Sequence, residues 1–469
     1  MRKLRGRTGQ IGVCCGIALL VCGAEVVAQT HQVVRVTELN ARNPNEVSIA
    51  INPLDLDTII AVSRAADPDT GRSTNFEYVS NDGGATWRTH VVSSHEARTQ
   101  GDDAIAIAAD GTAHHSYISF SGLREKRPET PANGIFVTTS SDSGGSWSDP
   151  VTVLEHRNSI TPFEDKPYLI VDRGRESRHR DTVYLAWTRF DVYGSRDPGD
   201  HSHIFVSHSL DRGRSFTPPV RVSDVGGDAL DSDGTLEGAV PAIGINGEVF
   251  LVWSGGSYLF FDRSDDGGWT WGEDRIIQET PGGWDIEVEG LARHNGMPVT
   301  GVDHSEGPSR GTLHVNWIDE RHGDPDVFLI SSSDGGGSWT NPVRVNDDTV
   351  GNGAAQMFTW LAVDSSDGSV NVVFYDRRTL EGTLTRLTLA RSVDGGRTFV
   401  NYPIDLAPFA SNPTVFFGDY TGIDALNGLV TPIFMHFVDE FEMAISVAVF
   451  RFQLGTQDLI VRALGQDLP

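Results

Sequence analysis

Short apolar runs separated by turn-forming residues recur along almost the whole chain. The stretch from Thr312 to Asp347 is typical, with runs at Leu313–Trp317, Val327–Ser331 and Val343–Val345. These runs are rich in Val, Ile, Leu or aromatic residues, and Gly, Pro, Asp or Asn bound each of them. That pattern indicates short antiparallel strands. It therefore predicts an all-β protein.

An octapeptide, Ser332–Trp339, lies between the second and third of these runs and fits the pattern S-x-D-x-G-x-[ST]-[WF]. The chain carries it six times, the other copies being Ser80–Trp87, Ser140–Trp147, Ser209–Phe216, Ser264–Trp271 and Ser392–Phe399. The Asp side chain can accept hydrogen bonds from amides of its own turn, and the Gly tolerates positive φ. The aromatic ring can pack the turn against its sheet. We therefore expect each copy to be a structural hairpin turn rather than a site of chemistry.

The octapeptide is identified as an Asp-box, and the chain resembles the sialidase-like β-propellers that carry this repeat (also called the BNR repeat). The resemblance covers nearly all of the chain after about residue 28. It implies a propeller built from four-stranded blades.

A second repeated feature predicts the number of blades. Upstream of each box lies a pair of strands joined by a turn with Asn or Asp, at Asn52, Asp110, Asp172, Asn246, Asp303, Asp364 and Asn427. The seventh unit lacks a box and a fourth strand after Phe450. The segment Gln32–Thr37 resembles the fourth strands Pro219–Ser223 and Pro342–Asn346, so we expect the N-terminal strand to complete the last blade. The prediction is a seven-bladed propeller closed in this way, with the six-bladed sialidase propeller as the alternative.

The start of the chain has the pattern of a secretory signal. Residues 1–28 combine a basic start, an apolar run from about Ile11 to Val21 and a small residue at Ala28. An alternative is a lipoprotein cleaved before Cys22. We therefore expect a secreted protein, periplasmic or extracellular, with one propeller domain over residues 29–455 and a tail over residues 456–469.

Composition excludes several classes of function. The formal net charge is −27, which disfavours nucleic acid and anionic membranes as partners. All three cysteines lie within residues 1–28, so the remaining chain has neither disulfides nor thiol chemistry. No zinc-type cluster or phosphate-binding Gly loop is present, and we expect a monomer without a cofactor.

Candidate site residues lie at the ends of the predicted inner strands. By resemblance to sialidases, a ligand would bind over the axis on the face opposite the boxes. The expected strand entrances on that face carry Asn45, Glu46, Asp102, Asp103, Glu164, Asp165, Lys166, Glu237, His294, Gln356, Asp419 and Tyr420. The exits of the second strands carry Arg64, Arg124, Arg189, Asp319, Arg321, Asp376, Arg377, Arg378 and His436. Carboxylates, arginines and a tyrosine gathered in one place suit the hydrolysis of sugars.

Two of these groups also have structural interpretations. Arg64 and Arg189 fall at one repeat position, and so do Arg321 and Arg378, which favours ion pairs that hold loops. The segment Asp228–Glu237 has the oxygen density of a calcium loop, but it misses the EF-hand spacing. A solvated loop is the simpler interpretation of that segment.

The resemblance to sialidases also implies roles for individual residues. Those enzymes use three arginines on the substrate carboxylate, a Tyr nucleophile assisted by Glu, and an Asp acid. Tyr420 is the candidate nucleophile, Asp102 or Asp103 the acid, and Glu237 or Glu46 the helper. Asp165, Lys166, Arg189, Arg321, Arg378 and Asp419 are the candidates for substrate binding. The Arg-Ile-Pro-like tripeptide of sialidases is absent, and Asn45-Glu46-Val47 stands at the comparable entrance.

Three functions follow from these observations. The first is a secreted, sialidase-like glycosidase acting on an acidic or neutral glycan. The second is a polysaccharide lyase, since several lyases use seven-bladed propellers with central His and Tyr, and His294, His436 and Tyr420 are available. The third is a non-catalytic propeller that binds a glycan or a protein.

Overall fold

The computed structural model describes residues 31–37, 42–66, 72–92, 98–123 and 130–453. The predicted signal segment 1–28 and the tail 456–469 lie outside the described residues. The described part consists of strands, loops and turns, and it contains no helix long and apolar enough to cross a membrane.

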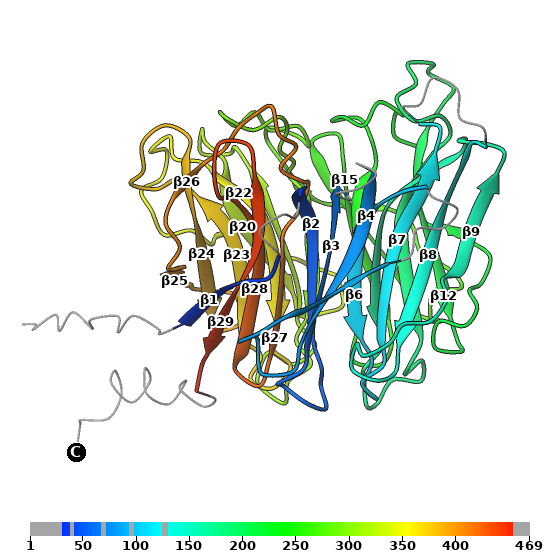
Figure 1. Ribbon diagram of the computed structural model, residues 1–469, viewed down its shortest axis with the longest axis horizontal. Coiled ribbons are helices and arrows are strands. Elements are labelled where there is room, and N and C mark those ends of the chain that lie inside the picture. Colours follow the sequence, from blue (N-terminus) through cyan, green and yellow to red (C-terminus); the bar gives the residue numbers. More distant parts are fainter. Residues whose placement is uncertain (1–30, 38–41, 67–71, 93–97, 124–129, 454–469) are drawn as a thin grey trace, which may run out of the picture.

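Seven antiparallel sheets make up the fold (Figure 1). Blade 1 consists of β2 (Arg42–Ile51), β3 (Ile59–Ala66), β4 (Ser73–Ser80) and β5 (Arg88–Val91). Blade 2 consists of β6 (Thr99–Ile107), β7 (Ala113–Ser121), β8 (Ala132–Ser140) and β9 (Val151–Arg157). Blade 3 consists of β10 (Phe163–Val171), β11 (Val183–Phe190), β12 (Ser202–Ser209) and β13 (Val220–Arg221). Blades 4 and 5 are β14 (Glu237–Ile243), β15 (Val249–Gly255), β16 (Tyr258–Ser264), β17 (Arg275–Glu279); and β18 (Val299–Val302), β19 (Leu313–Asp319), β20 (Asp326–Ser332), β21 (Val343–Arg344). Blade 6 is β22 (Gln356–Val363), β23 (Val370–Asp376), β24 (Leu384–Ser392) and β25 (Val400–Pro403), with β26 (Phe409–Ala410) also paired to β24.

The seventh blade draws on both ends of the described chain. Its order is β27 (Gly422–Leu426), β28 (Leu429–Phe437), β29 (Met443–Arg451) and then β1 (His31–Arg35). β1 runs antiparallel to β29, with Val33 opposite Ala448, and the two lie side by side in Figure 1. β27 also contacts β2 of blade 1, so the first and last inner strands are neighbours. The seven-bladed arrangement is confirmed, and the six-bladed alternative is wrong.

The six boxes form one hydrogen-bonded turn, repeated. In blade 5, Asp334 Oδ1 accepts the amide of Ser338 at 2.8 Å, and Oδ2 accepts its hydroxyl at 2.7 Å. Ser332 Oγ donates to Asp334 and accepts the amide of Gly336, both at 2.8 Å. The other five boxes make the same four bonds. Gly336 has φ 84°, and a Cβ there would collide with the ring of Phe261 in blade 4, so glycine serves both the turn and the packing between blades.

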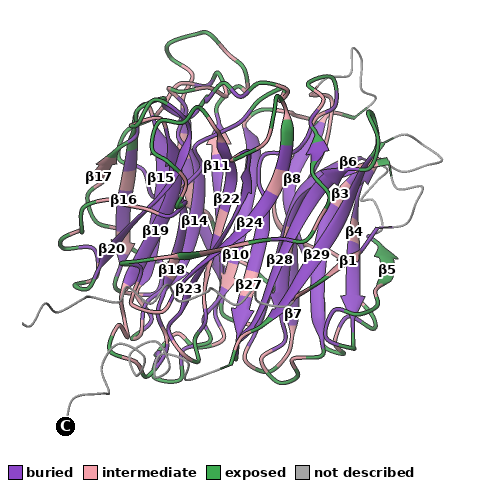
Figure 2. Ribbon diagram, turned by 90° about the vertical axis from the view of Figure 1, so that its left-hand side faces the viewer, coloured by how far each residue is buried: buried purple, intermediate pink, exposed green. Residues whose placement is uncertain are grey.

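The core lies between the blades. Strands of neighbouring sheets bury their facing side chains, which leaves most strand residues inaccessible to water (Figure 2). Trp187, Trp253 and Trp317 occupy the same place on the second strands of blades 3, 4 and 5, and all three are completely buried. Sheet-to-sheet packing of this kind holds the seven inner strands in a ring and fixes where each of them begins.

Candidate functional site at the propeller axis

A repeated irregularity lies near the start of five inner strands. The register between first and second strands shifts within residues 45–48, 101–104, 165–168, 237–240 and 357–360. At each shift one residue has positive φ: Glu46 (55°), Asp102 (55°), Lys166 (50°), Gly238 (73°) and Phe358 (43°). Bulges bend a strand and re-aim its side chains. Four of the five residues are not glycine, and such strained positions cluster at functional sites.

Lys166 is the centre of the charged group that these bulges bring together. Its Nζ lies 2.9 Å from Glu237 Oε2, 3.3 Å from Asp165 Oδ2, and 3.7 Å from both Asp231 Oδ1 and Asp419 Oδ2. Asp102 Oδ2 accepts the backbone amide of Lys166 at 3.0 Å. The carboxylates come from blades 2, 3, 4 and 7 and from the loop before β14. We call Glu46, Asp102, Asp165, Lys166, Asp231, Glu237, Arg293, Asp419 and Arg64 the axial cluster.

Two arginines form the accessible side of the axial cluster. Arg293 donates to both oxygens of Asp419, and its Nη1 lies 3.1 Å from Asp231 Oδ2. Arg64 bonds Glu46 at 2.9 Å and Asn45 at 2.7 Å. Both guanidinium groups lie against Phe416, at 5.2 and 5.3 Å from its ring centre. Their side chains are 40% and 25% exposed, whereas Lys166 is 4% exposed, so the arginines face the solvent above a buried ammonium.

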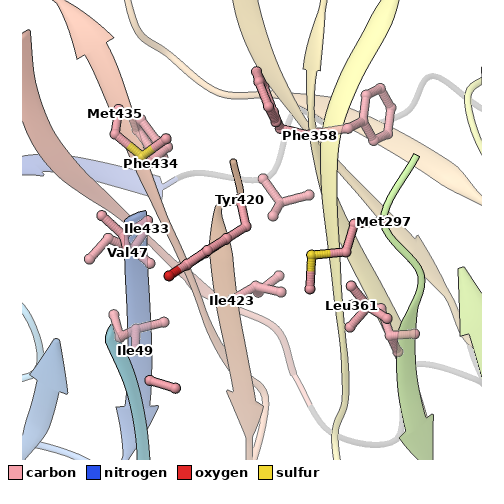
Figure 3. Packing of buried hydrophobic residues seen from close by; sticks show 14 of the residues in the cluster. Val47, Ile49, Met297, Phe358, Leu361, Tyr420, Ile423, Ile433, Phe434 and Met435 are labelled. Atoms are coloured by element: carbon pink, nitrogen blue, oxygen red, sulfur yellow. The ribbon is translucent and has the colours of Figure 1, made fainter. Parts of the chain in front are cut away.

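The loop between β17 and β18 covers the axis. This axial loop, residues 284–297, reaches several blades: Asn295 Nδ2 donates to the carbonyl of Asp419, and the amide of Phe358 donates to His294 Nε2. Tyr168 Oη lies 3.6 Å from the Met297 sulfur. Figure 3 shows Met297 pointing toward Tyr420 from the opposite side of the axis. The axial loop thus brings buried apolar side chains such as Met297 to the axis and supplies Arg293 to the charged group.

Burial gives the carboxyl groups of the axial cluster unequal acidity. It raises the pKa of Asp102 to about 7, helped by the charge of Glu46, and the pKa of Asp165 to about 8 against the pull of Lys166. Burial also raises the pKa of Glu237 well above its usual range. For Asp231 the effect of burial is outweighed by Lys166 and Arg293, which hold its pKa well below the usual value. Protonated and ionised carboxyl groups therefore stand side by side at neutral pH.

Asp103 does not join the axial cluster, in contrast to its predicted role as the acid. His115 Nε2 lies 2.7 Å from Asp103 Oδ1, and His115 Nδ1 lies 3.0 Å from Glu77 Oε1. His90 reaches the other oxygen of Glu77 at 2.6 Å. Consecutive residues of a strand point to opposite faces, so Asp102 faces the axis while Asp103 faces the packing between blades 1 and 2.

Tyr420 lies beneath the charges rather than among them. It is 2% exposed, and its ring packs against Tyr168 at 5.4 Å and Trp360 at 6.1 Å. Ile423 and Val47 lie beside it (Figure 3). Burial raises its pKa well above the usual value, so this phenol is a poor nucleophile in the present arrangement.

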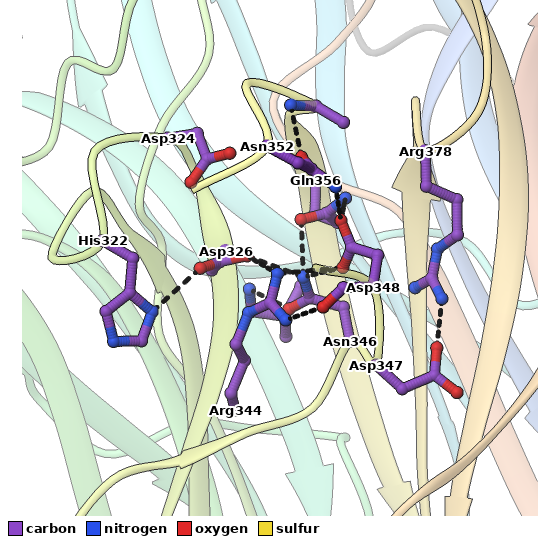
Figure 4. Close-up of polar contacts among 12 residues, drawn as sticks. His322, Asp324, Asp326, Arg344, Asn346, Asp347, Asp348, Asn352, Gln356 and Arg378 are labelled. Carbon is purple, nitrogen blue, oxygen red and sulfur yellow. Dashed lines mark hydrogen bonds and ion pairs between the residues drawn. The ribbon is translucent and has the colours of Figure 1, made fainter. Parts of the chain in front are cut away.

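Each of the three predicted substrate arginines pairs with an acid of its own blade. Arg189 pairs with Glu164 at 2.8 Å, Arg321 with Asp319 at 2.5 Å, and Arg378 with Asp376 at 2.5 Å. Arg378 also reaches Asp347 in the neighbouring blade (Figure 4). Each of these three arginines is therefore engaged in an ion pair and none lies in the axial cluster, whereas Arg64, at the repeat position of Arg189, does.

The sequence reasoning missed two members of the axial cluster, Asp231 and Arg293. The sequence indicates Asp231 only as part of a possible calcium loop. In the structure, the acids of that loop contact different partners. Asp228 accepts hydrogen bonds from its own loop, and Asp233 accepts the amides of Trp284 and Asp285 at 2.8 Å. Arg293 stands one residue before the predicted His294, and only that proximity pointed to it. In the described residues no group of His, Cys, Asp and Glu has the arrangement of a metal site.

The histidines expected of a lyase are buried and hold hydrogen bonds to other parts of the fold. Burial lowers the pKa of His294 to about 3 and that of His436 to about 4. His294 accepts the amide of Phe358, whereas His436 bonds Ser446 Oγ within blade 7 at 2.9 Å.

No protein-family model and no curated protein sequence matches this chain. Among solved structures it is similar to a protein of unknown function from Dyadobacter fermentans, with 14% identity, 91% of this chain and 99% of that one covered, and a TM-score of 0.49. It is also similar to the Penicillium chrysogenum α-L-arabinanase complexed with arabinobiose, with 15% identity, 81% of this chain and 98% of that one covered, and a TM-score of 0.48. A third similar structure is the NanB sialidase of Streptococcus pneumoniae, with 11% identity, 91% of this chain and 98% of that one covered, and a TM-score of 0.45. Sialidases and arabinanases are thus among the propellers that the chain is similar to in fold.

Proposed function

We propose that the protein is a secreted glycoside hydrolase that cleaves an acidic glycan over the axial cluster. The observation that carries this proposal is the pairing of carboxyl groups with opposed acidity. Asp102 and Asp165 hold protons near neutral pH, while Asp231 beside them stays ionised. Glycosidases need these two states, one to protonate the leaving oxygen and one to act as base or nucleophile.

Lys166 sets the spacing of the acids. Its Nζ lies 3.3 Å from Asp165 and 3.7 Å from Asp231, so both carboxyl groups approach one ammonium. The charge of Lys166 keeps Asp231 ionised, and burial keeps the proton on Asp165. Asp165 is then the general acid and Asp231 the base or nucleophile, with Asp102 sharing the proton of Asp165.

Arg293 and Arg64 supply the specificity for an acidic sugar. Both guanidinium groups are partly exposed at the mouth of the site, and Arg presents paired N–H donors that fit a carboxylate. This arrangement is sialidase-like in chemistry, although it uses other arginines than those the resemblance indicates.

A screen of the purified protein against acidic and neutral polysaccharides tests the proposal. Wild type should release reducing ends from an acidic glycan, and Asp165→Asn should cut turnover by at least about a hundredfold. Asp262→Asn is the matched control, because Asp262 is also a buried aspartate with a pKa raised by burial, to about 6, but lies on β16 away from the axis. Equal loss of turnover in both variants would remove the assignment of Asp165, and a product that absorbs in the ultraviolet would indicate a lyase.

A second candidate function is non-catalytic glycan binding. The observation that favours it is the closure of the axial cluster, where Asp102 and Asp165 are 9% and 8% exposed and are already paired. Saturable binding of an acidic oligosaccharide, lost in Arg293→Gln, without turnover of any glycan in the screen, would establish this function instead.

A further inference from the structure

A second polar pocket, of about 480 Å³, lies on blade 3 away from the axis. Arg189 of β11, His203 and Phe205 of β12, and Arg221 of β13 line it, together with Asp191. These strands are the second, third and fourth of the blade, so the pocket belongs to its outer part. It is separate from the axial cluster, which the first strands build.

The positive charges of this pocket are incompletely neutralised. Arg189 bonds Glu164 at 2.8 Å and lies 4.0 Å above the ring of Phe205. Arg221 is exposed, and no carboxylate of the described residues pairs with it. Glu164 is also within 2.7 Å of His156 and 2.5 Å of Trp187 Nε1, so its charge is shared among three donors.

In blade 5 the arginine at the position of Arg221 is neutralised by nearby acids. There Arg344 lies opposite Phe328, as Arg221 lies opposite Phe205. Asp326 stands two residues before Phe328, and Arg344 Nη2 bonds it at 2.6 Å and Asp348 at 2.9 Å (Figure 4). In blade 3 the residue two before Phe205 is His203. The acid that neutralises the outer arginine in blade 5 is therefore replaced by a base in blade 3.

We propose that this blade 3 pocket binds an oxyanion, the carboxylate or sulfate group of a ligand, between Arg221 and Arg189. Arg221 supplies a guanidinium fork that no carboxylate of the described residues pairs with, and Arg189 is held in place by its bond to Glu164 and its stacking on Phe205. Two planar guanidinium groups fit the paired oxygens of such a group, in a way that a lone ammonium does not.

His203 makes the binding depend on pH. Burial lowers its pKa, and the neighbouring Arg221, His201 and Arg189 lower it further while Asp191 opposes them. A bound anion favours the charged imidazole, so affinity should rise as the pH falls through the pKa of His203. Salt should weaken binding, because the site is open to solvent.

Calorimetric titration of the full chain with sodium sulfate, sodium phosphate and glucuronate tests the site. Comparison of the three titrations shows whether the site prefers a sulfate, a phosphate or a carboxylate group. Wild type should bind at least one of them saturably, and Arg221→Gln should weaken that binding at least tenfold with an unchanged melting temperature. His203→Asp, which copies blade 5, should weaken it as strongly by pairing Arg221. Arg212→Gln is the control, since Arg212 lies in the same blade but pairs with Asp110 at 2.9 Å and Asp181 at 3.2 Å.

Either of two results would overturn the proposal. One is the absence of saturable binding of all three anions to the wild-type protein. The other is an affinity of Arg221→Gln for the anion that equals the affinity of wild type or that of the control Arg212→Gln. Since no axial residue is changed, failure of this site would leave the proposed hydrolase untouched, and the reverse also holds.

Discussion

The ammonium nitrogen of Lys166 lies 2.9 Å from Oε2 of Glu237 at the axis of the propeller. Lys166 is 4% exposed and Glu237 is completely buried, so water does little to stabilise a charge on either group, and burial holds the pKa of Glu237 well above its usual range. Burying such a pair is costly, and removing one partner is costlier still. The pair lies at the centre of the axial cluster, because Asp165, Asp231 and Asp419 also lie within 4 Å of the same ammonium.

Replacing Lys166 with Met should test that organisation. The neighbouring acids would lose their common cation, so we expect a loss of about 3 to 5 kcal/mol in the free energy of unfolding at pH 8. The loss should be smaller at pH 5, where the carboxyl groups can take up protons instead. Urea unfolding at both pH values measures the difference, and an equal loss at both would contradict the electrostatic explanation.

The proposed hydrolysis should depend on the proton held by Asp102 and Asp165. The pKa values of these groups are raised to about 7 and about 8, so turnover should be high below this range and fall as the pH rises through it. Rates measured from pH 5 to 10 on the substrate found in the screen check this. Asp165→Asn should abolish the alkaline decline along with most of the turnover, whereas Asp262→Asn should keep the wild-type profile.

The buried His115 should link stability to pH. Burial opposes its charge, but Asp103 and Glu77 outweigh burial and raise its pKa to about 9. The ordinary histidine pKa in an unfolded chain is about 6.5. The stabilisation is therefore complete below pH 6.5 and is lost as the pH rises through about 9, and we expect it to be on the order of 2 to 3 kcal/mol.

His115→Gln should remove this dependence. Unfolding free energies of wild type and variant should differ most near pH 6 and converge toward pH 10. His314→Gln serves as a comparison, because burial lowers the pKa of His314 to about 4 and leaves it neutral throughout that range. A constant difference between wild type and His115→Gln over the whole range would show that the charge of His115 does not stabilise the fold.

Removing β1 should expose the edge of blade 7. A variant that begins after Thr37 would lose the pairing of residues 31–35 with β29 and leave the backbone groups of β29 unpaired. We expect a lower melting temperature and concentration-dependent association. A variant that begins at Gln29 should melt like the full chain, and equal melting of the two variants would mean that β1 adds nothing to closure.

The sequence by itself determined the features that consecutive residues encode. The Asp-box needs only a Ser, an Asp and a Gly at fixed offsets, and all of its hydrogen bonds stay within eight residues. Repetition of that turn and of the strand pairs made seven blades predictable. The likeness of Gln32–Thr37 to two fourth strands indicated where β1 belongs.

Only the tertiary structure decided which side chains meet at the axis. Asp102 and Asp103 are adjacent in sequence, yet strand alternation and the positive φ of Asp102 send them to different environments. Arg293 and Asp231 come from loops whose paths depend on packing against other blades. No local pattern could place them, because a charge cluster assembled from five blades is a property of ring closure and not of any single segment.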